Sequence, residues 1–285
     1  MTPKTVVPFS AILCMGIAAL LSFCIPLALF LWYRKRRKAD LLPFFIGMAV
    51  MFLFALVLES LVHQLVLNVL PVGQVILNNI WLYALYGGLM AGLFEETGRF
   101  IAFKTVLKRC QTRDVNALMY GAGHGGIEAA MVLGGAMISN IVIAVMLNLG
   151  LASLLTATAN EATLPQLEAV FDALKTTAPA SYFIGLIERV IAVPLQIALS
   201  VLVWFAAKKK RKWYLYPIAI LLHFLVDGVM VVAAHYISSI WIDYAILVTV
   251  IVPVLLLTFA VWKRNRTEEP GSVTDAEKTD ADPAV

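Results

Sequence analysis

The sequence predicts an all-α protein, a polytopic transmembrane helical bundle with seven or eight spans. Of its 285 residues, 61% are hydrophobic and only 14% are charged, and the mean hydropathy is +0.87. The apolar residues form long blocks, and about 20 mostly apolar residues suffice for a helix to cross the hydrocarbon core of a bilayer. We expect one transmembrane, peptidase-like domain over residues 1–266. The polar residues 267–285 are expected to form a disordered cytoplasmic tail.

The expected spans follow the apolar blocks in chain order. The seven blocks are 9–33, 41–62, 75–103, 114–135, 182–207, 213–236 and 240–262. Five basic residues follow the first block and only Lys4 precedes it, so we interpret it as an uncleaved anchor rather than a secretory signal. A further apolar stretch at 136–156 is either an interfacial or re-entrant helix or an eighth crossing. The sequence shows no internal repeat of the kind that many transporters contain.

Basic residues predict the orientation of the chain in the membrane. Seventeen of the 22 Lys and Arg lie in four clusters, at 34–38, 104–113, 208–212 and 263–266. Cytoplasmic loops of membrane proteins are enriched in these residues, so we expect the N-terminus outside and the C-terminus in the cytoplasm. Basic residues at the ends of spans indicate contact with a lipid bilayer and exclude a nucleic-acid-binding face.

Three expected spans carry charged residues that a bilayer disfavours. They are Glu95, Glu96 and Arg99 in the third span, His124 and Glu128 in the fourth, and His223 and Asp227 in the sixth. A charge at membrane depth costs about 2.5–3.5 kcal/mol, so each residue needs a partner or a function. Each span contains a pair of these residues four positions apart, and such a pair shares one helix face.

Depth indicates that these residues form one site. Counted from the nearest basic cluster at about 1.5 Å per residue, Glu95, His124 and His223 lie at similar levels, roughly 13 to 16 Å deep. We therefore expect one water-accessible site, reached from the cytoplasmic half of the membrane. The glycines beside His124 leave room for a neighbouring helix or a substrate backbone; they are Gly121, Gly123, Gly125 and Gly126.

The residue types suit hydrolysis of a peptide bond. A carboxylate beside an imidazole can take a proton from water and return it to the leaving amine, and a second imidazole can stabilise an oxyanion. Arg99 can hold one glutamate ionised. Glu95 and Glu96 differ by about 100° around their helix, so we expect only one of them to face the water. The sequence leaves open which one does.

The same residues resemble the three motifs of the CAAX-protease and bacteriocin-processing (Abi) superfamily. The matching segments are Glu95-Glu96-x-x-Arg99, Tyr120-x-x-x-His124 and His223-x-x-x-Asp227. The residues around the first two look closest to the YhfC-type membrane peptidases of bacteria, and PrsW-type proteases are more distant relatives. The CAAX pattern differs from this sequence in the position of Arg99 and in having Phe and Asn in place of Tyr120 and Asp227. Prenylated substrates are therefore not implied.

The resemblance implies an intramembrane protease of the bacterial cell membrane, with a membrane protein or peptide as its substrate. It assigns activation of water to Glu95 or Glu96 together with His124. It assigns substrate positioning or oxyanion stabilisation to His223 and Asp227.

Several alternatives stay open. Glu96, His124 and His223 could hold a catalytic zinc ion, or the same groups could work without a metal. Glu128 could be catalytic or could only form a hydrogen bond with His124. The protein could instead be a proton-coupled transporter, or a non-catalytic scaffold or immunity protein.

Two other polar pairs are expected to be structural or interfacial. Glu188 and Arg189 stand at the start of the fifth predicted span, and Glu59 and His63 stand at the end of the second.

Overall fold

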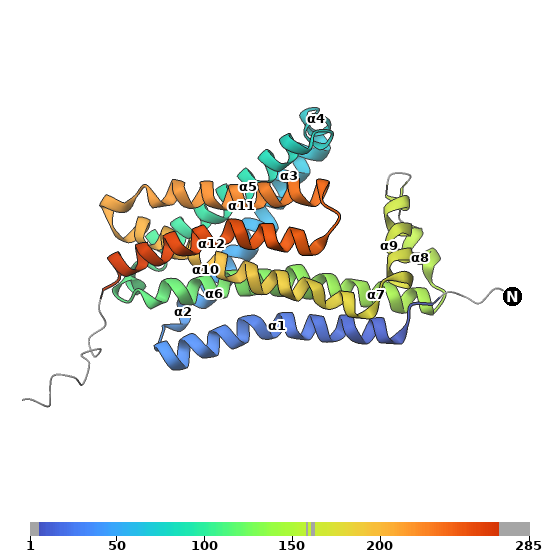
Figure 1. Ribbon diagram of the computed structural model, residues 1–285, viewed down its shortest axis with the longest axis horizontal. Helices are drawn as coiled ribbons and strands as arrows, with labels where there is room; N and C mark the ends of the chain where they lie inside the picture. Colours follow the sequence, from blue (N-terminus) through green and yellow to red (C-terminus); the bar gives the residue numbers. More distant parts are fainter. Residues whose placement is uncertain (1–5, 158, 161–162, 268–285) are drawn as a thin grey trace, which may run out of the picture.

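The computed structural model describes residues 6–157, 159–160 and 163–267, and these residues form helices and connecting segments without a β-strand. Long helices lie side by side along the bundle (Figure 1). The predicted tail lies outside the described residues, apart from Thr267. The α-helices are α1 (Phe9–Arg37), α2 (Leu41–Val50), α3 (Ser60–His63), α4 (Val72–Leu77), α5 (Ile80–Lys104), α6 (Val115–Ala129), α7 (Ala136–Asn148), α8 (Ala152–Thr156), α9 (Leu164–Thr176), α10 (Ile184–Lys208), α11 (Leu215–Tyr236) and α12 (Ile240–Asn265).

Shorter helical segments connect or extend these elements. The π-helical turns η1 (Met51–Glu59), η2 (Gln64–Val69) and η4 (Ala130–Gly135) continue neighbouring α-helices, and the 3₁₀ turns are η3 (Lys108–Thr112), η5 (Pro179–Phe183) and η6 (Lys210–Lys212). π-Helical turns inside longer helices occur frequently at functional sites.

Six stretches of the described chain are long and apolar enough to cross a membrane. They are Phe9–Arg37, Leu41–Val69, Val115–Asn148, Pro179–Lys208, Lys210–Tyr236 and Ile240–Asn265. The 25-residue helix α5 is only slightly shorter than the shortest of these, which has 26 residues, and its two glutamates and its arginine make it less apolar. It packs along α11 inside the bundle, and we interpret it as a further span. The polytopic helical bundle is confirmed, whereas the number of crossings stays a prediction.

The stretch at 136–156 does not form a separate crossing or a re-entrant helix. Residues 136–148 prolong the fourth span, because α6, η4 and α7 form one helix of 34 residues. The chain turns only at Gly150, where φ is 77°, a backbone conformation that glycine adopts without a steric penalty. The prediction for this stretch was wrong because the helix continues through Gly134 and Gly135, at which the predicted fourth span ends. Gly134 packs closely on α1, since a Cβ there would lie 2.5 Å from Ser22 Oγ. The second span is also longer than predicted and ends at Val69.

Helix α6 lies at the centre of the packing, and its glycines allow close helix contacts. A Cβ atom at Gly123 would lie 2.0 Å from the carbonyl oxygen of Phe44 in α2, and one at Gly121 would lie 2.6 Å from the Cα of Ile197 in α10. A Cβ at Gly125 would meet Gln196 of α10, and one at Gly126 would meet Pro26 of α1. Neighbouring helices, rather than a substrate backbone, therefore occupy the space that these glycines leave.

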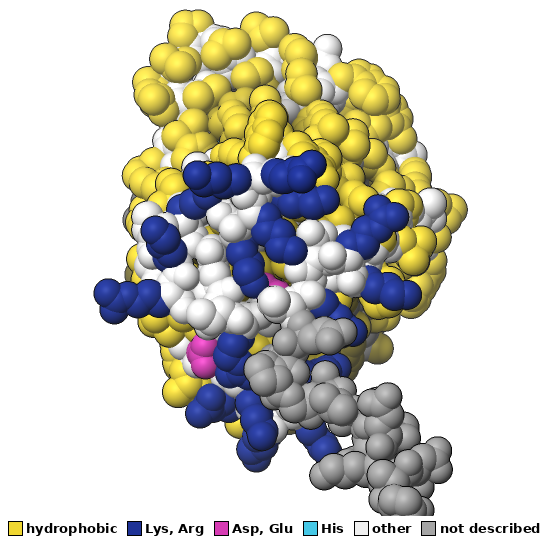
Figure 2. Space-filling model, turned by 90° about the vertical axis from the view of Figure 1, so that its left-hand side faces the viewer, with side chains coloured by type: hydrophobic (Ala, Val, Ile, Leu, Met, Phe, Trp, Pro, Cys, Tyr) yellow, Lys and Arg dark blue, Asp and Glu magenta, His cyan; other side chains and the backbone are white. Residues whose placement is uncertain are grey.

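The basic clusters gather at one end of the bundle. Lys and Arg side chains surround this end, and the flanks next to it are apolar, as a surface embedded in a bilayer requires (Figure 2). Helices α1, α5, α10 and α12 all finish here with basic residues in their last turns. The shared end agrees with the positive-inside pattern, and its cytoplasmic placement stays a prediction.

Asp114 joins three parts of the chain at this end. Its carboxylate accepts hydrogen bonds from Trp204 Nε1 at 2.9 Å, Lys208 Nζ at 2.6 Å and the backbone nitrogen of Thr267 at 2.8 Å. Burial alone would raise the pKa of Asp114, but the hydrogen bonds from Lys208, Thr267 and Trp204 outweigh it and hold the pKa below its ordinary value. The start of α6 is thereby fixed against the ends of α10 and α12.

The orientation can be tested by cysteine labelling in intact cells. With the three native cysteines replaced by serine, we expect Lys210→Cys to resist a membrane-impermeant thiol reagent until the cells are permeabilised, because positively charged loops stay in the cytoplasm. Asp172→Cys, on α9 at the other end, is the matched control and should react at once. The reverse pattern of labelling would invert the topology.

Candidate active site

The two adjacent glutamates of α5 contact histidines on different helices. Glu95 Oε2 lies 2.9 Å from His124 Nε2 of α6, and Glu96 Oε1 lies 2.8 Å from His223 Nδ1 of α11. All four residues are buried. The three helices that the sequence singled out therefore meet in one network, as the common depth predicted.

Arg99 connects the two halves of this network. Its side chain is fully buried, and it forms ion pairs with Glu96 and, at 3.1 Å, with Glu95. It also donates a hydrogen bond to the side-chain oxygen of Gln196 on α10, and the amide nitrogen of Gln196 donates to Glu95 Oε2 at 3.3 Å. A buried charge is tolerated only with compensating partners, and the two glutamates share the single positive charge of Arg99, while each also contacts a histidine.

The second tier of acidic residues differs from the sequence-based expectation. Glu128 pairs with Arg189 Nη1 of α10 at 3.0 Å, although His124 stands one helical turn before it on α6. Asp227 Oδ2 lies 3.5 Å from His223 Nε2, and its side chain is partly exposed. His223 is thus held between two carboxylates, those of Glu96 and Asp227.

A cavity of about 320 Å³ reaches this network from one side. Glu95, His223, Asp227, Glu128 and Arg189 all line it. The other three members of the network, Glu96, Arg99 and His124, lie behind this wall and are fully buried. Of the two glutamates, Glu95 is therefore the one that borders the cavity.

The cavity approaches the network from the end opposite to the basic clusters. Its outer wall includes Glu188 near the start of α10, and Asp243 and Tyr244 near the start of α12. Both helices run toward the basic end and finish there (Figure 1). The sequence predicted access from the basic half of the membrane, and the cavity instead lies on the other side of the network.

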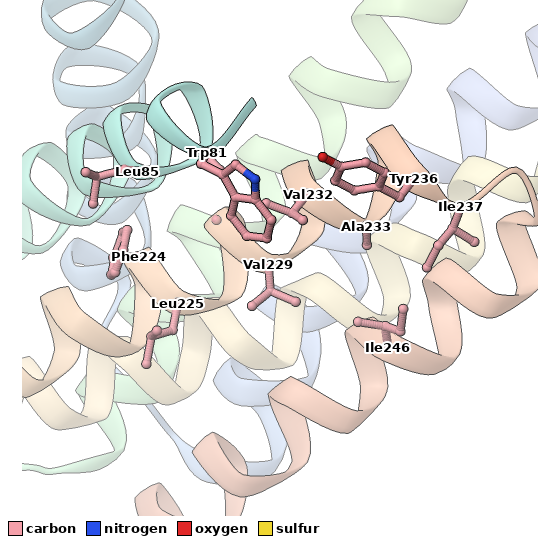
Figure 3. A pocket seen from close by; sticks show the side chains of 12 residues that line it. Trp81, Leu85, Phe224, Leu225, Val229, Val232, Ala233, Tyr236, Ile237 and Ile246 are labelled. Carbon is pink, nitrogen blue, oxygen red and sulfur yellow. The ribbon is translucent and has the colours of Figure 1, made fainter. Parts of the chain in front are cut away.

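A larger cavity, of about 580 Å³, lies between α5, α11 and α12. Apolar side chains dominate its wall, and Trp81 and Tyr236 stand at its edge (Figure 3). Its lining residues, all of them in the described part of the chain, include no acid, arginine, lysine or histidine. They offer no group for acid–base chemistry, so we exclude this cavity as a site of hydrolysis.

The arrangement of the polar residues also bears on metal binding. Carboxylate and imidazole groups are suitable zinc ligands, yet no group of three such side chains in the described residues is placed to hold a metal ion. His124 and His223 each contact a different glutamate, and Arg99 pairs with both glutamates. The predicted metal set of Glu96, His124 and His223 therefore does not fit a metal ion in this arrangement, and we derive no chemical step through one.

Sequence comparison identifies the family of the chain. Residues 21–252 match the model of a family described as YhfC intramembrane metalloprotease. The chain belongs to this family. A YhfC relative from Bacillus subtilis (strain 168), described as an uncharacterized membrane protein, is 35% identical over 254 residues, which cover 88% of this chain and 95% of the relative. No solved structure matches the chain.

The match to the YhfC family confirms the resemblance that the motifs indicated, and the matched range contains all seven predicted site residues. Two further residues of the network were not predicted as site residues. Gln196 is uncharged, and Arg189 was interpreted as a structural or interfacial residue at the start of the fifth predicted span. Both could have been selected by treating every polar side chain within a predicted span as a candidate, because a polar side chain inside the membrane needs a buried partner.

Proposed function

We propose that the protein is an intramembrane protease in which Glu95 activates the attacking water molecule. The observation that carries this proposal is the position of Glu95. It borders the cavity while it contacts His124 and pairs with Arg99. The family description, which names an intramembrane metalloprotease, supports the same class of reaction.

In the proposed reaction, Glu95 takes a proton from water as the water oxygen attacks the carbonyl carbon of the scissile bond. The C–N bond then breaks, and the proton held by Glu95 passes to the leaving amine. His124 contacts Glu95 Oε2 through its Nε2 atom. This hydrogen bond orients the carboxylate and stabilises its negative charge. Arg99 pairs with both glutamates without reaching the cavity.

His223 is the residue best placed to stabilise the oxyanion. An ionised carboxylate only accepts hydrogen bonds, so the contact with Glu96 places a proton on Nδ1 of His223. Asp227 lies next to Nε2, and carboxylates on both sides of the ring favour a protonated imidazole. Such a ring can donate from Nε2 to an oxyanion that forms in the cavity.

The reaction can be tested in cells and in proteoliposomes. Mass spectrometry of membrane peptides should show fragments in cells that carry the native chain, and these should be missing from cells that carry Glu95→Gln. The same proteoliposomes can be assayed for proton-coupled flux. Flux without peptide release would favour a transporter, and neither activity would favour a scaffold.

We expect peptide release to survive treatment with a metal chelator at constant pH. The physical reason is that Arg99 pairs with both glutamates and a histidine contacts each of them, so side chains of the protein already engage the carboxylates that a metal ion would need. Elemental analysis of the purified protein should accompany the assay. Loss of peptide release on chelation, with recovery on adding zinc, would instead support the metal-dependent reaction that the family description names.

A further inference from the structure

Carboxylates dominate the cavity wall beyond Glu95. Five carboxylates line the cavity, from Glu95, Glu128, Glu188, Asp227 and Asp243, whereas Arg189 and His223 are its basic residues. Arg189 is already paired with Glu128 and Glu188, and His223 contacts Glu96 and Asp227. Both cations of the wall are thus already engaged with other carboxylates.

Asp243 shows that this excess of negative charge is not satisfied within the protein. Asp243 is only 8% exposed, and it lines the cavity from the first turn of α12. Its Oδ1 atom is buried without a hydrogen-bond partner. A buried carboxylate oxygen without a partner costs free energy, and a cationic ligand placed against this carboxylate would lower that cost.

We infer that the outer part of this cavity, lined by Glu188 and Asp243, binds a cationic group of the substrate. The inference rests on the proposed protease function and specifies its substrate class. The group is an ammonium or guanidinium, carried either by a lysine or arginine side chain or by the free N-terminus of the peptide.

The length of the cavity sets the distance between this group and the cleaved bond. Glu188 stands eight residues before Gln196 on α10, or about 12 Å along the helix at 1.5 Å per residue. Gln196 contacts Glu95. An extended peptide covers about 12 Å with three or four residues. The cationic group therefore lies three or four residues from the scissile bond.

A binding experiment on Glu95→Gln tests the inference independently of catalysis. The probes are fluorescent apolar peptides that carry one lysine, or norleucine at the same place, with the N-terminus free or acetylated. We expect the lysine or free-amine peptide to bind about tenfold more tightly than the neutral one, as a difference of about 1.4 kcal/mol gives. If lysine strengthens binding when the N-terminus is acetylated, the side chain is the source of the cation. If a free N-terminus strengthens binding of the norleucine peptide, the N-terminus is the source.

Variants of Asp243 in the same background decide the role of the acidic wall. Asp243→Asn should remove most of the preference, and Asp243→Glu should keep it, which distinguishes charge from folding. Asp172→Asn, an exposed residue on α9, is the matched control. Equal binding of charged and neutral peptides, or a preference that survives Asp243→Asn, would overturn the inference.

Peptide release by the native chain separates this inference from the proposed function. Cationic preference without any cleavage would leave the binding site standing and remove the protease proposal. Cleavage without cationic preference would support the protease proposal and remove the cation-binding site.

Discussion

Replacing Glu95 by glutamine is expected to lower the rate of peptide hydrolysis by about 10²- to 10⁴-fold, the usual contribution of general base catalysis. Glutamine has nearly the shape of glutamate, so the contacts with His124 and Gln196 can persist. An amide cannot take up a proton near neutral pH. The loss should therefore appear in turnover, measured by peptide release from proteoliposomes, rather than in expression or insertion.

Two further glutamate variants make this experiment specific. Glu168→Gln, on the exposed surface of α9, should leave turnover unchanged. Glu96→Gln should reduce turnover less than Glu95→Gln, because Glu96 acts through His223 and does not border the cavity. Native turnover in Glu95→Gln would remove this residue from the reaction, and native turnover in both Glu95→Gln and Glu96→Gln would end the proposal that this site hydrolyses the peptide.

The sequence predicted the polar network because a charged residue in an apolar block has few explanations. Glu95, His124 and His223 could be placed at one level by counting residues along helices, and no tertiary information was needed. The length of the fourth span could not be obtained in this way. Residues 130–148 are uncharged, and their polar residues are Ser139, Asn140 and Asn148, so no charged residue marks where that span leaves the membrane.

The choice between the two glutamates depended on the rotation of α5, which tertiary packing fixes. Cβ atoms at Gly88 and Gly92 would each lie 2.7 Å from a backbone oxygen of α11, so these positions pack directly on that helix. Glu96 follows at the same spacing of four and faces His223 on α11. Glu95 is rotated by about 100° from it, toward His124 and the cavity. The spacing of Gly88, Gly92 and Glu96 can be seen in the sequence, but the helix that packs against them cannot.

Removing the charge of Arg99 is expected to have the largest effect on stability. Arg99→Met should lower the free energy of unfolding by about 3–5 kcal/mol, as expected when one partner of a buried ion pair is lost. Both glutamates would then remain buried without their shared cation. Unfolding in detergent, followed by circular dichroism, measures the change. Lys104→Met, at the exposed end of the same helix, is the matched control and should have little effect.

A triple variant separates the structural role of this charge cluster from its chemical role. Combining Arg99→Met with Glu95→Gln and Glu96→Gln removes the cation together with both anions, and neutral replacement of a complete buried cluster is often tolerated. We expect the triple variant to regain most of the stability that Arg99→Met loses, while it stays inactive because no general base remains. If Arg99→Met alone were as stable as the native chain, the charge of Arg99 would not be needed to keep the two glutamates buried. That result would contradict the role of Arg99 as their shared cation, and elemental analysis of the purified variant would then show whether a bound metal ion takes its place.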